Sequence, residues 1–336
     1  MAANVVADDR ALSVELGFDR TIDRSLVHRA AVAEVFVTDL RPLGDSRFLA
    51  GAQLPLTHGY YSDHVQRPVL FDPLLILEAG RQAGIGGAHL MGLPRHIIML
   101  VDTFSLRIDC LPALAVGKKP GEMRIDCSFE AKRVRAGKVR RGVVRQELYV
   151  DGLHAGTHTM EVQVVTHNEH YALRKAMRGT PARSTEDFPD APDDDQVAPH
   201  LVGRVHPLNV AIAGVVRGRK TVQARVTPRF GNRALFDHEY DHLPAMTLTE
   251  AARQLALLSV GDGTGSAAGR MHVTAVTGSF GRFAELDHPV FATAATSPGS
   301  AGGETVTVDV SFTQESALIA ESTLTLVPSA SIGTRQ

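Results

Sequence analysis

Two short stretches of the sequence place the same reactive side chains at the same spacing. Positions i, i+3 and i+4 share one face of a helix, so each stretch presents its three groups as one cluster. Each cluster holds a carboxylate, a guanidinium and an amide: Glu78, Arg81 and Gln82 in EAGRQ, and Glu250, Arg253 and Gln254 in EAARQ. The glutamates are candidate catalytic residues, and the arginines and glutamines are candidate substrate ligands.

The chemistry of the cluster follows from the residue types. A carboxylate that is kept from water has a raised pKa, which would suit Glu78 or Glu250 to general base catalysis. The planar fork of arginine matches a phosphate group, which favours Arg81 or Arg253 for an anionic substrate. One exposed helical pair of this kind contributes only about 0.2–0.5 kcal/mol. Repetition of the cluster within two apolar helices instead favours a functional role.

A histidine precedes each cluster, in what reads as a loop. His64 lies upstream of Glu78, and His238 lies upstream of Glu250 at nearly the same spacing. Both histidines follow an aspartate. We therefore add His64 and His238 to the candidate catalytic residues, because histidine is the side chain that most often transfers protons in enzymes.

The elements that must position these residues are two helices and their flanking strands. The first helix is predicted to begin near Pro73, with Asp72 as its N-cap, and to end among the glycines at 84, 86 and 87. The second is predicted over 244–260. Alternating apolar and polar residues predict strands around both helices, and four of the strands after the first helix are HIIMLVDTFSLRID, GEMRIDCSFEAKRV, KVRRGVVRQELYV and AGTHTMEVQVV.

The order of elements repeats in the second half of the chain. Strands are predicted at RVHPLNVAIAGVV and TVQARVT before the helix, and at MHVTAVTGSFGRF, PVFATAAT, ETVTVDVSFTQ and LIAESTLTLV after it. The EA-x-RQ strings begin at positions 78 and 250 and the Asp-His pairs at positions 63 and 237, so the two motifs repeat at nearly the same offset. Agreement in both order and residues indicates an internal duplication.

A change of composition divides the two halves. The stretch TPARSTEDFPDAPDDDQVAP at 180–199 is rich in proline and acidic residues, which is typical of an exposed linker. The predicted domain organisation is an N-terminal arm at 1–24, a first domain at 25–166, a linker at 167–203, a second domain at 204–328 and a tail at 329–336.

Composition limits the classes of partner. The chain has 336 residues, with 35 Lys and Arg against 37 Asp and Glu, so its net charge of -2 gives no reason to expect a nucleic acid or an anionic membrane. Two cysteines form neither a disulfide framework nor a four-ligand zinc site. We expect a cytoplasmic protein without a metal or cofactor, and the sequence reveals neither a signal peptide nor a transmembrane run.

The segment from His64 to Gln82 resembles the central signature of the hotdog-fold hydroxyacyl carrier-protein dehydratases, although His64 is followed by Val-Gln-Arg and not by their Phe-Pro-Gly. A closer resemblance is to the A-factor biosynthesis family, which is similar to two fused hotdog domains. The motifs that carry it are LVHRAAVAEVFVTD at 26–39, DHVQRPVLFDPLLILEAGRQ at 63–82, LVGRVHPLNV at 201–210 and FDHEYDHLPAMTLTEAARQ at 236–254.

This resemblance implies an α+β fold, with two tandem hotdog domains packed as a pseudo-dimer and a curved antiparallel sheet around each central helix. It also implies an acyltransferase that moves a β-ketoacyl group from acyl carrier protein to the hydroxyl of dihydroxyacetone phosphate, giving a precursor of a butenolide or γ-butyrolactone signal. The free N–H groups near Leu74 and Met246, at the helix starts, would stabilise an oxyanion.

In hotdog dimers the site lies at the interface, so the resemblance implies that His64 faces Glu250 and that His238 faces Glu78. Both sites could work, or one could be structural. The second half's loop, which adds Asp241 and His242, looks closest to the family pattern.

Three questions stay open at this point. The alternatives to acyl transfer are a hotdog dehydratase or thioesterase, and a non-catalytic protein that binds an acyl ligand and regulates partners. The chain could be a monomer or a homodimer. The basic hairpin at 131–146 is either a solvated sheet edge or a docking patch for an acidic carrier protein.

Overall fold

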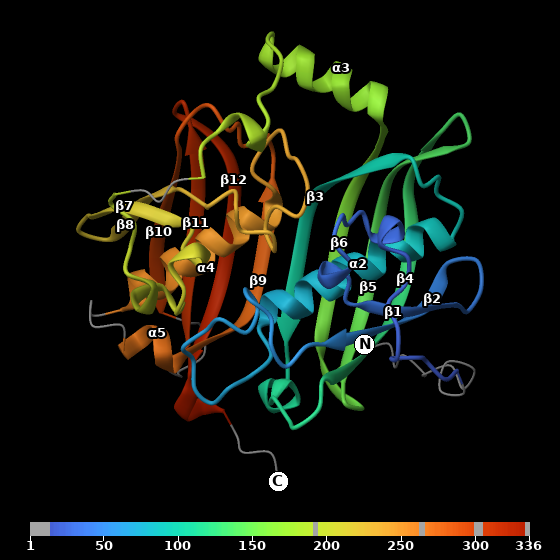
Figure 1. Ribbon diagram of the computed structural model, residues 1–336, viewed down its shortest axis with the longest axis horizontal. Helices are drawn as coiled ribbons and strands as arrows, with labels where there is room; N and C mark the ends of the chain where they lie inside the picture. The colour runs from blue at the N-terminus through green and yellow to red at the C-terminus, as the bar shows by residue number, and fades with distance from the viewer. Residues whose placement is uncertain (1–13, 191–193, 262–265, 299–304, 333–336) are drawn as a thin grey trace.

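One continuous antiparallel sheet of twelve strands organises the computed structural model, which describes residues 14–190, 194–261, 266–298 and 305–332 (Figure 1). The first half contributes β1 (Val37–Pro42), β2 (Arg47–Leu54), α2 (Pro73–Leu90), β3 (Ile97–Ile108), β4 (Gly121–Arg135), β5 (Lys138–Val150), β6 (Leu153–Thr166) and α3 (His167–Arg178). The second half contributes β7 (Ile212–Arg217), β8 (Thr221–Val226), α4 (Ala245–Val260), α5 (Ser266–Arg270), β9 (Met271–Phe280), β10 (Val290–Pro298), β11 (Val306–Gln314) and β12 (Ala317–Pro328).

The strand order shows the duplication directly. It runs β1-β2-β4-β5-β6-β3 and continues as β9-β12-β11-β10-β8-β7, so the second half repeats the first in reverse. The seam is the antiparallel pair β3 and β9, in which Thr103 lies opposite Ser279 and Arg107 lies opposite Ala275. The prediction of two tandem hotdog domains packed as a pseudo-dimer is confirmed.

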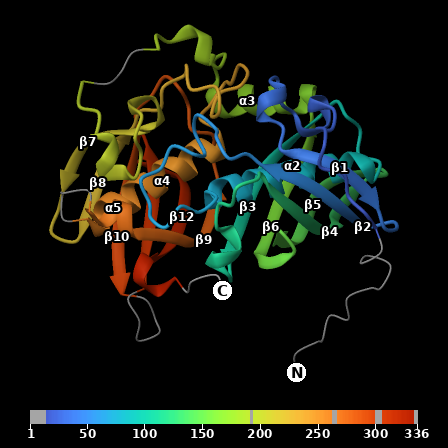
Figure 2. The ribbon, with the colours of Figure 1, turned by 60° about the horizontal axis from the view of Figure 1, so that its bottom comes forward.

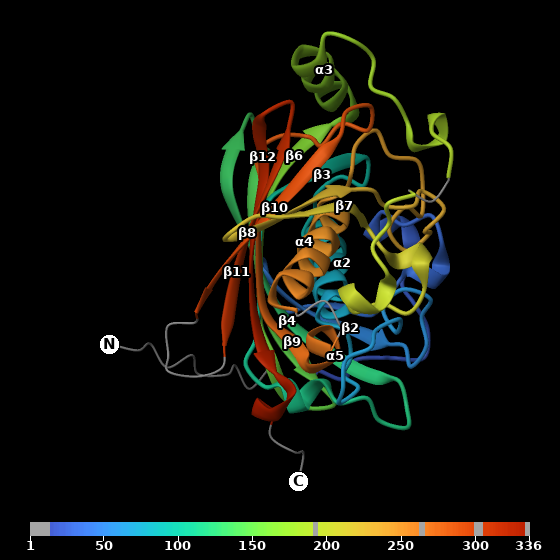
Figure 3. The ribbon, with the colours of Figure 1, turned by 90° about the vertical axis from the view of Figure 1, so that its left-hand side faces the viewer.

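Both long helices lie on the same face of this sheet (Figure 3). Helix α2 begins where the sequence predicts, with Pro73 in the first turn and the Asp72 side chain accepting a hydrogen bond from the Leu74 backbone N–H at 2.8 Å. It runs to Leu90, however, so the prediction that it ends among the glycines is wrong. A Cβ atom at Gly87 would lie 1.9 Å from the Phe48 ring, so this glycine allows the helix to approach the sheet closely.

Short 3-10 helices connect these elements, at Arg24–Val27, Val32–Glu34, Leu111–Leu114, Thr185–Asp187, Pro199–Val202, Pro207–Asn209 and Ser329–Ser331. The stretch 26–39 contains parts of the first two of these 3-10 helices, and β1 begins only at Val37.

The connection between the halves contains a helix that the sequence did not predict. Helix α3 stands at one end of the molecule, beyond the sheet (Figure 1). The halves that it connects meet at β3 and β9, which lie side by side in Figure 2. Helix α3 begins with a capping box, in which the Thr166 side chain accepts a hydrogen bond from the Glu169 N–H and the Glu169 carboxylate accepts one from the Thr166 N–H. Part of the predicted arm, linker and tail falls outside the described residues, and the domain boundaries stay predictions.

Candidate functional site

In each cluster predicted from the sequence, the glutamate is the sixth residue of its helix. The two clusters also have the same internal contacts. Glu78 is fully buried and accepts hydrogen bonds from Arg81 at 2.7 Å and from Gln82 at 2.7 Å. Glu250 is also fully buried and accepts from Arg253 and Gln254, each at 2.5 Å. The prediction that each triplet shares one helix face is confirmed.

A second arginine, which the sequence analysis did not single out, completes each cluster. Arg29 donates to Glu78 at 2.5 Å, and Arg204 donates to Glu250 at 2.9 Å. Both arginines are buried, and their positions correspond in the strings LVHR at 26–29 and LVGR at 201–204. The repeated Leu-Val-x-Arg string, which lies at nearly the same offset as the helix motifs, was the signal that would have identified them.

The two glutamines lie in the core and face the backbone. Gln82 accepts a hydrogen bond from the Phe36 N–H at 2.9 Å and donates to the Glu34 carbonyl oxygen at 2.7 Å. Gln254 makes the same pair of contacts with Ala211 and Asn209. Because each amide ties its helix to the chain that leads into the sheet, we assign both glutamines a structural role in place of substrate binding.

The expected raised pKa of the catalytic glutamate is wrong for Glu78. Burial alone would raise this pKa, but the positive charges of Arg29 and Arg81 and their hydrogen bonds lower it to about 2. Glu78 is therefore ionised at neutral pH and is held by three donors. Such a carboxylate is a poor proton acceptor, and it orients the two guanidinium groups.

The clusters differ in the partners of one guanidinium nitrogen, Nη1 of Arg81 and of Arg253. Arg253 Nη1 donates to both oxygens of Asp72, at 2.7 Å each, so the N-cap of α2 neutralises the arginine of α4. The N-cap of α4 is Pro244, which has no side-chain cap. Within the described part of the chain, Arg81 Nη1 has no acceptor, and the side chain is 20% exposed.

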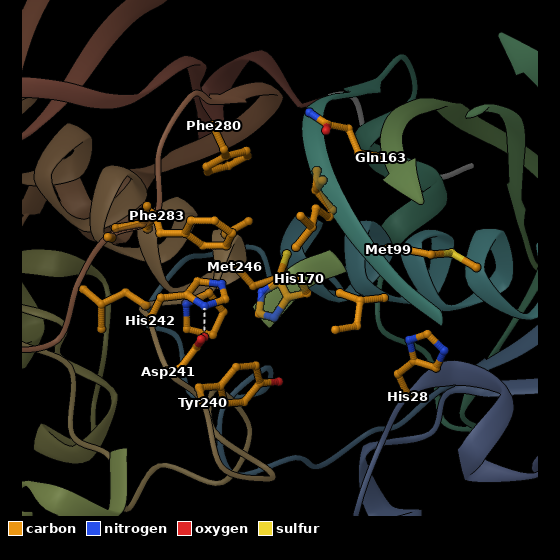
Figure 4. Close-up of a pocket in the computed structure, with 18 of the residues that line it drawn as sticks. His28, Met99, Gln163, His170, Tyr240, Asp241, His242, Met246, Phe280 and Phe283 are labelled. Atoms are coloured by element: carbon orange, nitrogen blue, oxygen red, sulfur yellow. Dashed lines mark hydrogen bonds and ion pairs between the residues drawn. The ribbon is translucent and has the colours of Figure 1, made fainter. Parts of the chain in front are cut away.

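A large cavity adjoins the Arg81 cluster but not its counterpart. Its volume is about 790 Å³, within the roughly 300–1,000 Å³ range of small-molecule sites. It lies between the halves, with β3 and Met99 on one side and Phe283, Asp241 and His242 on the other (Figure 4). The cavity beside His64, Asp72 and Arg253 measures only about 30 Å³.

His238 lies in the large cavity with its imidazole oriented by Asp237. Its Nδ1 bonds to Asp237 Oδ1 at 2.6 Å, and the ring is 41% exposed. The Asp237 carboxylate is itself fixed by Arg29 at 3.2 Å and by the Ala30 N–H at 2.7 Å. Burial opposes the charge of Asp237, but His238 and Arg29 hold its pKa well below the usual range. Through Asp237 and Arg29, the loop histidine is thus linked to Glu78.

A second aspartate and histidine pair follows in the same loop. His242 Nδ1 bonds to Asp241 Oδ1 at 2.6 Å, and both side chains line the cavity. Asp241 also accepts a hydrogen bond from Arg174 of α3 at 2.9 Å. The added residues that drew attention to this loop in the sequence do lie at the cavity.

His28 lines the cavity as a neutral imidazole. His89 Nδ1 lies 3.1 Å from the Leu93 carbonyl oxygen and must therefore donate to it, which leaves His89 Nε2 as an acceptor. His28 Nε2, 3.0 Å away, then donates to His89. Burial, together with the charges of His89 and Arg81, lowers the pKa of His28 to about 4, so its ring is neutral near pH 7.

Hydrogen-bond donors for an oxyanion are available at only one of the two helix starts that we predicted. At α2 the Leu74 N–H is already bonded to Asp72. At α4 the residues Ala245 and Met246 line the cavity, and no acceptor for their N–H groups lies among the described residues. Tyr240 lines the same cavity, and burial raises its pKa to about 12, so its hydroxyl keeps its proton.

Two kinds of comparison relate this chain to known sequences. The family model described as an A-factor biosynthesis hotdog domain matches residues 12–166 and 186–329. Proteins named 2-oxo-3-(phosphooxy)propyl 3-oxoalkanoate synthase are similar along most of the chain. The one from Streptomyces virginiae is 30% identical over 84% of this chain and 90% of its own length, and the one from Streptomyces griseus is 31% identical over 86% and 90%.

Solved structures are more distant. The 12:0-ACP thioesterase from Umbellularia californica aligns with 83% of this chain and 94% of its own, with a TM-score of 0.48 and 12% identity. In the part of the chain that the structure describes, no helix has the length and apolar character needed to span a membrane.

Proposed function

The chain belongs to the A-factor biosynthesis hotdog family, and on this basis we propose that it is an acyltransferase that joins a 3-oxoacyl group to the hydroxyl of dihydroxyacetone phosphate. The ester so formed is the compound in the relatives' name, and it precedes a butenolide or γ-butyrolactone signal. The geometric observation that carries the proposal is one large cavity lined by Arg81, His238 and several apolar side chains. In the described part of the chain Arg81 Nη1 has no acceptor, and Asp237 orients His238.

We assign the phosphate of the acceptor to Arg81. The guanidinium is fixed by two hydrogen bonds to Glu78, at 2.7 and 2.9 Å, and its Nη1 edge is left for a ligand. At the equivalent place in the other half, Arg253 Nη1 binds both oxygens of Asp72. The Asp72 carboxylate thus occupies in one copy the position that we propose for the phosphate in the other.

We assign the role of general base to His238. Asp237 fixes the imidazole through Nδ1, which leaves Nε2 to accept the proton of the acceptor hydroxyl. The alkoxide oxygen attacks the thioester carbonyl, and the oxyanion is stabilised by the α4 N-terminus and the Tyr240 hydroxyl. The carbon–sulfur bond then breaks, and the proton passes from His238 to the leaving thiolate. The products are the phosphorylated ester and a free thiol.

The other copy serves the fold in this proposal. Glu250, Arg253, Arg204 and Asp72 satisfy one another, and the cavity beside His64 is too small for an acyl group and a phosphate. Of the alternatives that the sequence leaves open, we therefore propose one working site, formed by the helix of the first half and the loop of the second.

The direct test is to incubate the purified protein with a 3-oxoacyl carrier protein and dihydroxyacetone phosphate, and to detect the phosphorylated ester by mass spectrometry. We expect ester and free thiol in equal amounts, and neither without the acceptor. Thiol release that does not depend on the acceptor would instead identify a thioesterase, and an enoyl product would identify a dehydratase.

We further propose that the donor is carried by an acidic carrier protein that docks on the tip of the β4–β5 hairpin. Arg140 and Arg141 of this hairpin are already paired with Glu169 and Asp102. In the described part of the chain, three exposed cations at the tip have no such partner: Arg133, Arg135 and Lys138. Arg141 of the same hairpin binds Asp102, a residue that lines the cavity, so the hairpin and the cavity are in contact.

Reversing two of these charges is expected to weaken docking. The double variant Arg133→Glu and Arg135→Glu should raise the KM for the carrier-bound donor about tenfold at low salt, because charge steering accelerates association. The KM for a short pantetheine thioester should stay unchanged. Lys118→Glu with Lys119→Glu alters the net charge equally at exposed residues that do not line the cavity, and serves as the control. An equal rise in KM in both double variants would reject this docking surface.

We also propose that the enzyme acts in the cytoplasm, since Cys110 and Cys127 are free thiols, as expected in a reducing compartment.

A further inference from the structure

Helix α3 belongs to neither part of the chain that the family model matches. The matched segments end at residue 166 and resume at 186, and α3 covers His167–Arg178. It nevertheless forms part of the cavity, through residues one and two turns apart on one face: His170, Leu173 and Met177. A segment that lies between the two matched domains therefore contributes to the candidate site.

The buried Arg174 and the partly buried Arg178 anchor α3 to the second half. Arg174 donates to Glu285 at 2.6 Å and to Asp241 at 2.9 Å, and its guanidinium lies 4.3 Å above the centre of the Phe283 ring. Arg178 binds Glu285 and also Asp287, the latter at 2.6 Å. These contacts hold the helix against the loop that carries the second aspartate and histidine pair. The helix is thereby a fixed part of the wall.

The α3 side chains that face the cavity include exposed apolar groups. Leu173 is 38% exposed and Met177 is 48% exposed, although both line the cavity. Phe280 and Phe283 line the same cavity, and Figure 4 shows their rings on the side away from His28 and Tyr240. Apolar surface that lines a cavity and lacks protein contacts is the surface that an apolar ligand covers on binding.

The cavity therefore has two chemically different parts. Arg81, His28 and His238 supply charge and hydrogen bonds in one part. In the other part Leu173, Met177 and Phe280 supply apolar contacts, beside a Phe283 ring that His170, Arg174 and His242 contact. A 3-oxoacyl donor has the same division, because its reacting carbonyl is polar and its alkyl chain is not. With the carbonyl at His238, the alkyl chain extends along the apolar part.

We propose that α3 is the wall against which the alkyl chain of the acyl donor lies, and that Leu173 and Met177 set the chain lengths that the enzyme accepts. This inference rests on the proposed acyl transfer and adds to it a determinant of the substrate. It predicts that substitutions at these two residues change the preference among donors and leave the acceptor unaffected.

The test compares 3-oxoacyl pantetheine thioesters of six, ten and fourteen carbons with dihydroxyacetone phosphate as the acceptor. Leu173→Trp should lower the ratio of kcat/KM for the longest donor to that for the shortest by about tenfold, because added bulk excludes the far methylene groups. Met177→Ala should raise the same ratio. The KM for dihydroxyacetone phosphate should not change in either variant.

Tyr171→Ala provides the matched control, since Tyr171 lies on the same helix, is 69% exposed and does not line the cavity. Binding of unreactive amide analogues of the same donors, measured by calorimetry, should show the same shifts in preference. Ester could form while the chain-length ratios of the Leu173 and Met177 variants match that of Tyr171→Ala. This result would reject the proposed contact between α3 and the alkyl chain, and it would leave the proposed acyl transfer intact. If the binding preference shifts but no ester forms, the contact between α3 and the alkyl chain is supported and the proposed acyl transfer is rejected.

Discussion

His238→Asn is expected to lower kcat for ester formation by about 10²- to 10⁴-fold, the usual contribution of a positioned general base. The KM for dihydroxyacetone phosphate should change little, because Arg81 and its contacts to Glu78 remain. Steady-state rates at saturating donor measure this effect. An unchanged thermal midpoint would show that the loss is chemical, since His238 is partly exposed and its removal leaves the core intact.

The control is the same substitution at the duplicated position. His64 lies beside the 30 Å³ cavity, near Asp72 and Arg253, and His64→Asn should retain kcat within a few-fold. If His64→Asn is the more damaging variant, the working site is the other copy. If both variants keep full activity, neither histidine is the base and the proposed role of His238 is wrong.

Arg253→Gln is expected to destabilise the protein by about 3–5 kcal/mol, because it leaves Asp72 and part of the charge of Glu250 buried without a cation. Both carboxylates are almost fully shielded from solvent. The free energy of unfolding from urea titration measures the loss. The variant should also lose activity in proportion to the unfolded fraction, and that part should recover on cooling to a temperature at which it folds.

Arg81→Gln, the same change in the other copy, should show the opposite pattern. Glu78 keeps its contacts to Arg29 and Gln82, and Arg81 is partly exposed, so the loss of stability should be smaller. The kcat/KM for dihydroxyacetone phosphate should fall about 10- to 100-fold, as expected when a charged hydrogen bond to substrate is removed. Equal stability losses with equal kinetics in the two variants would contradict the division between the copies.

Most of the fold could be predicted because the strands alternate clearly and the two helices carry nearly the same five-residue string. The strands after each helix lie where predicted. The end of α2 was misjudged because glycine usually marks a helix terminus, whereas Gly87 here makes room for Phe48. Helix α3 was missed because its composition is polar, although the Thr166 and Glu169 capping box and Gly179 at its end are signals that favour a helix.

The candidate site was harder to predict for a physical reason. The spacing identified Glu78 and Arg81, but the pKa of a buried carboxylate depends on which charges the fold brings to it, and Arg29 lies 49 residues away in the sequence. The same holds for Asp72, which the sequence suggests only as a helix cap. Its contact with Arg253, 181 residues away, distinguishes the two copies.

The two copies that meet at the seam between β3 and β9 belong to a single polypeptide. In an assembly of two identical chains, every mutation appears twice. An aspartate that bound the arginine of one site would therefore bind the arginine of the equivalent site as well. A covalent tandem removes that symmetry. One copy can keep Asp72 at its helix start while the other has Pro244, and natural selection can then improve a scaffold and a catalyst independently within one gene product.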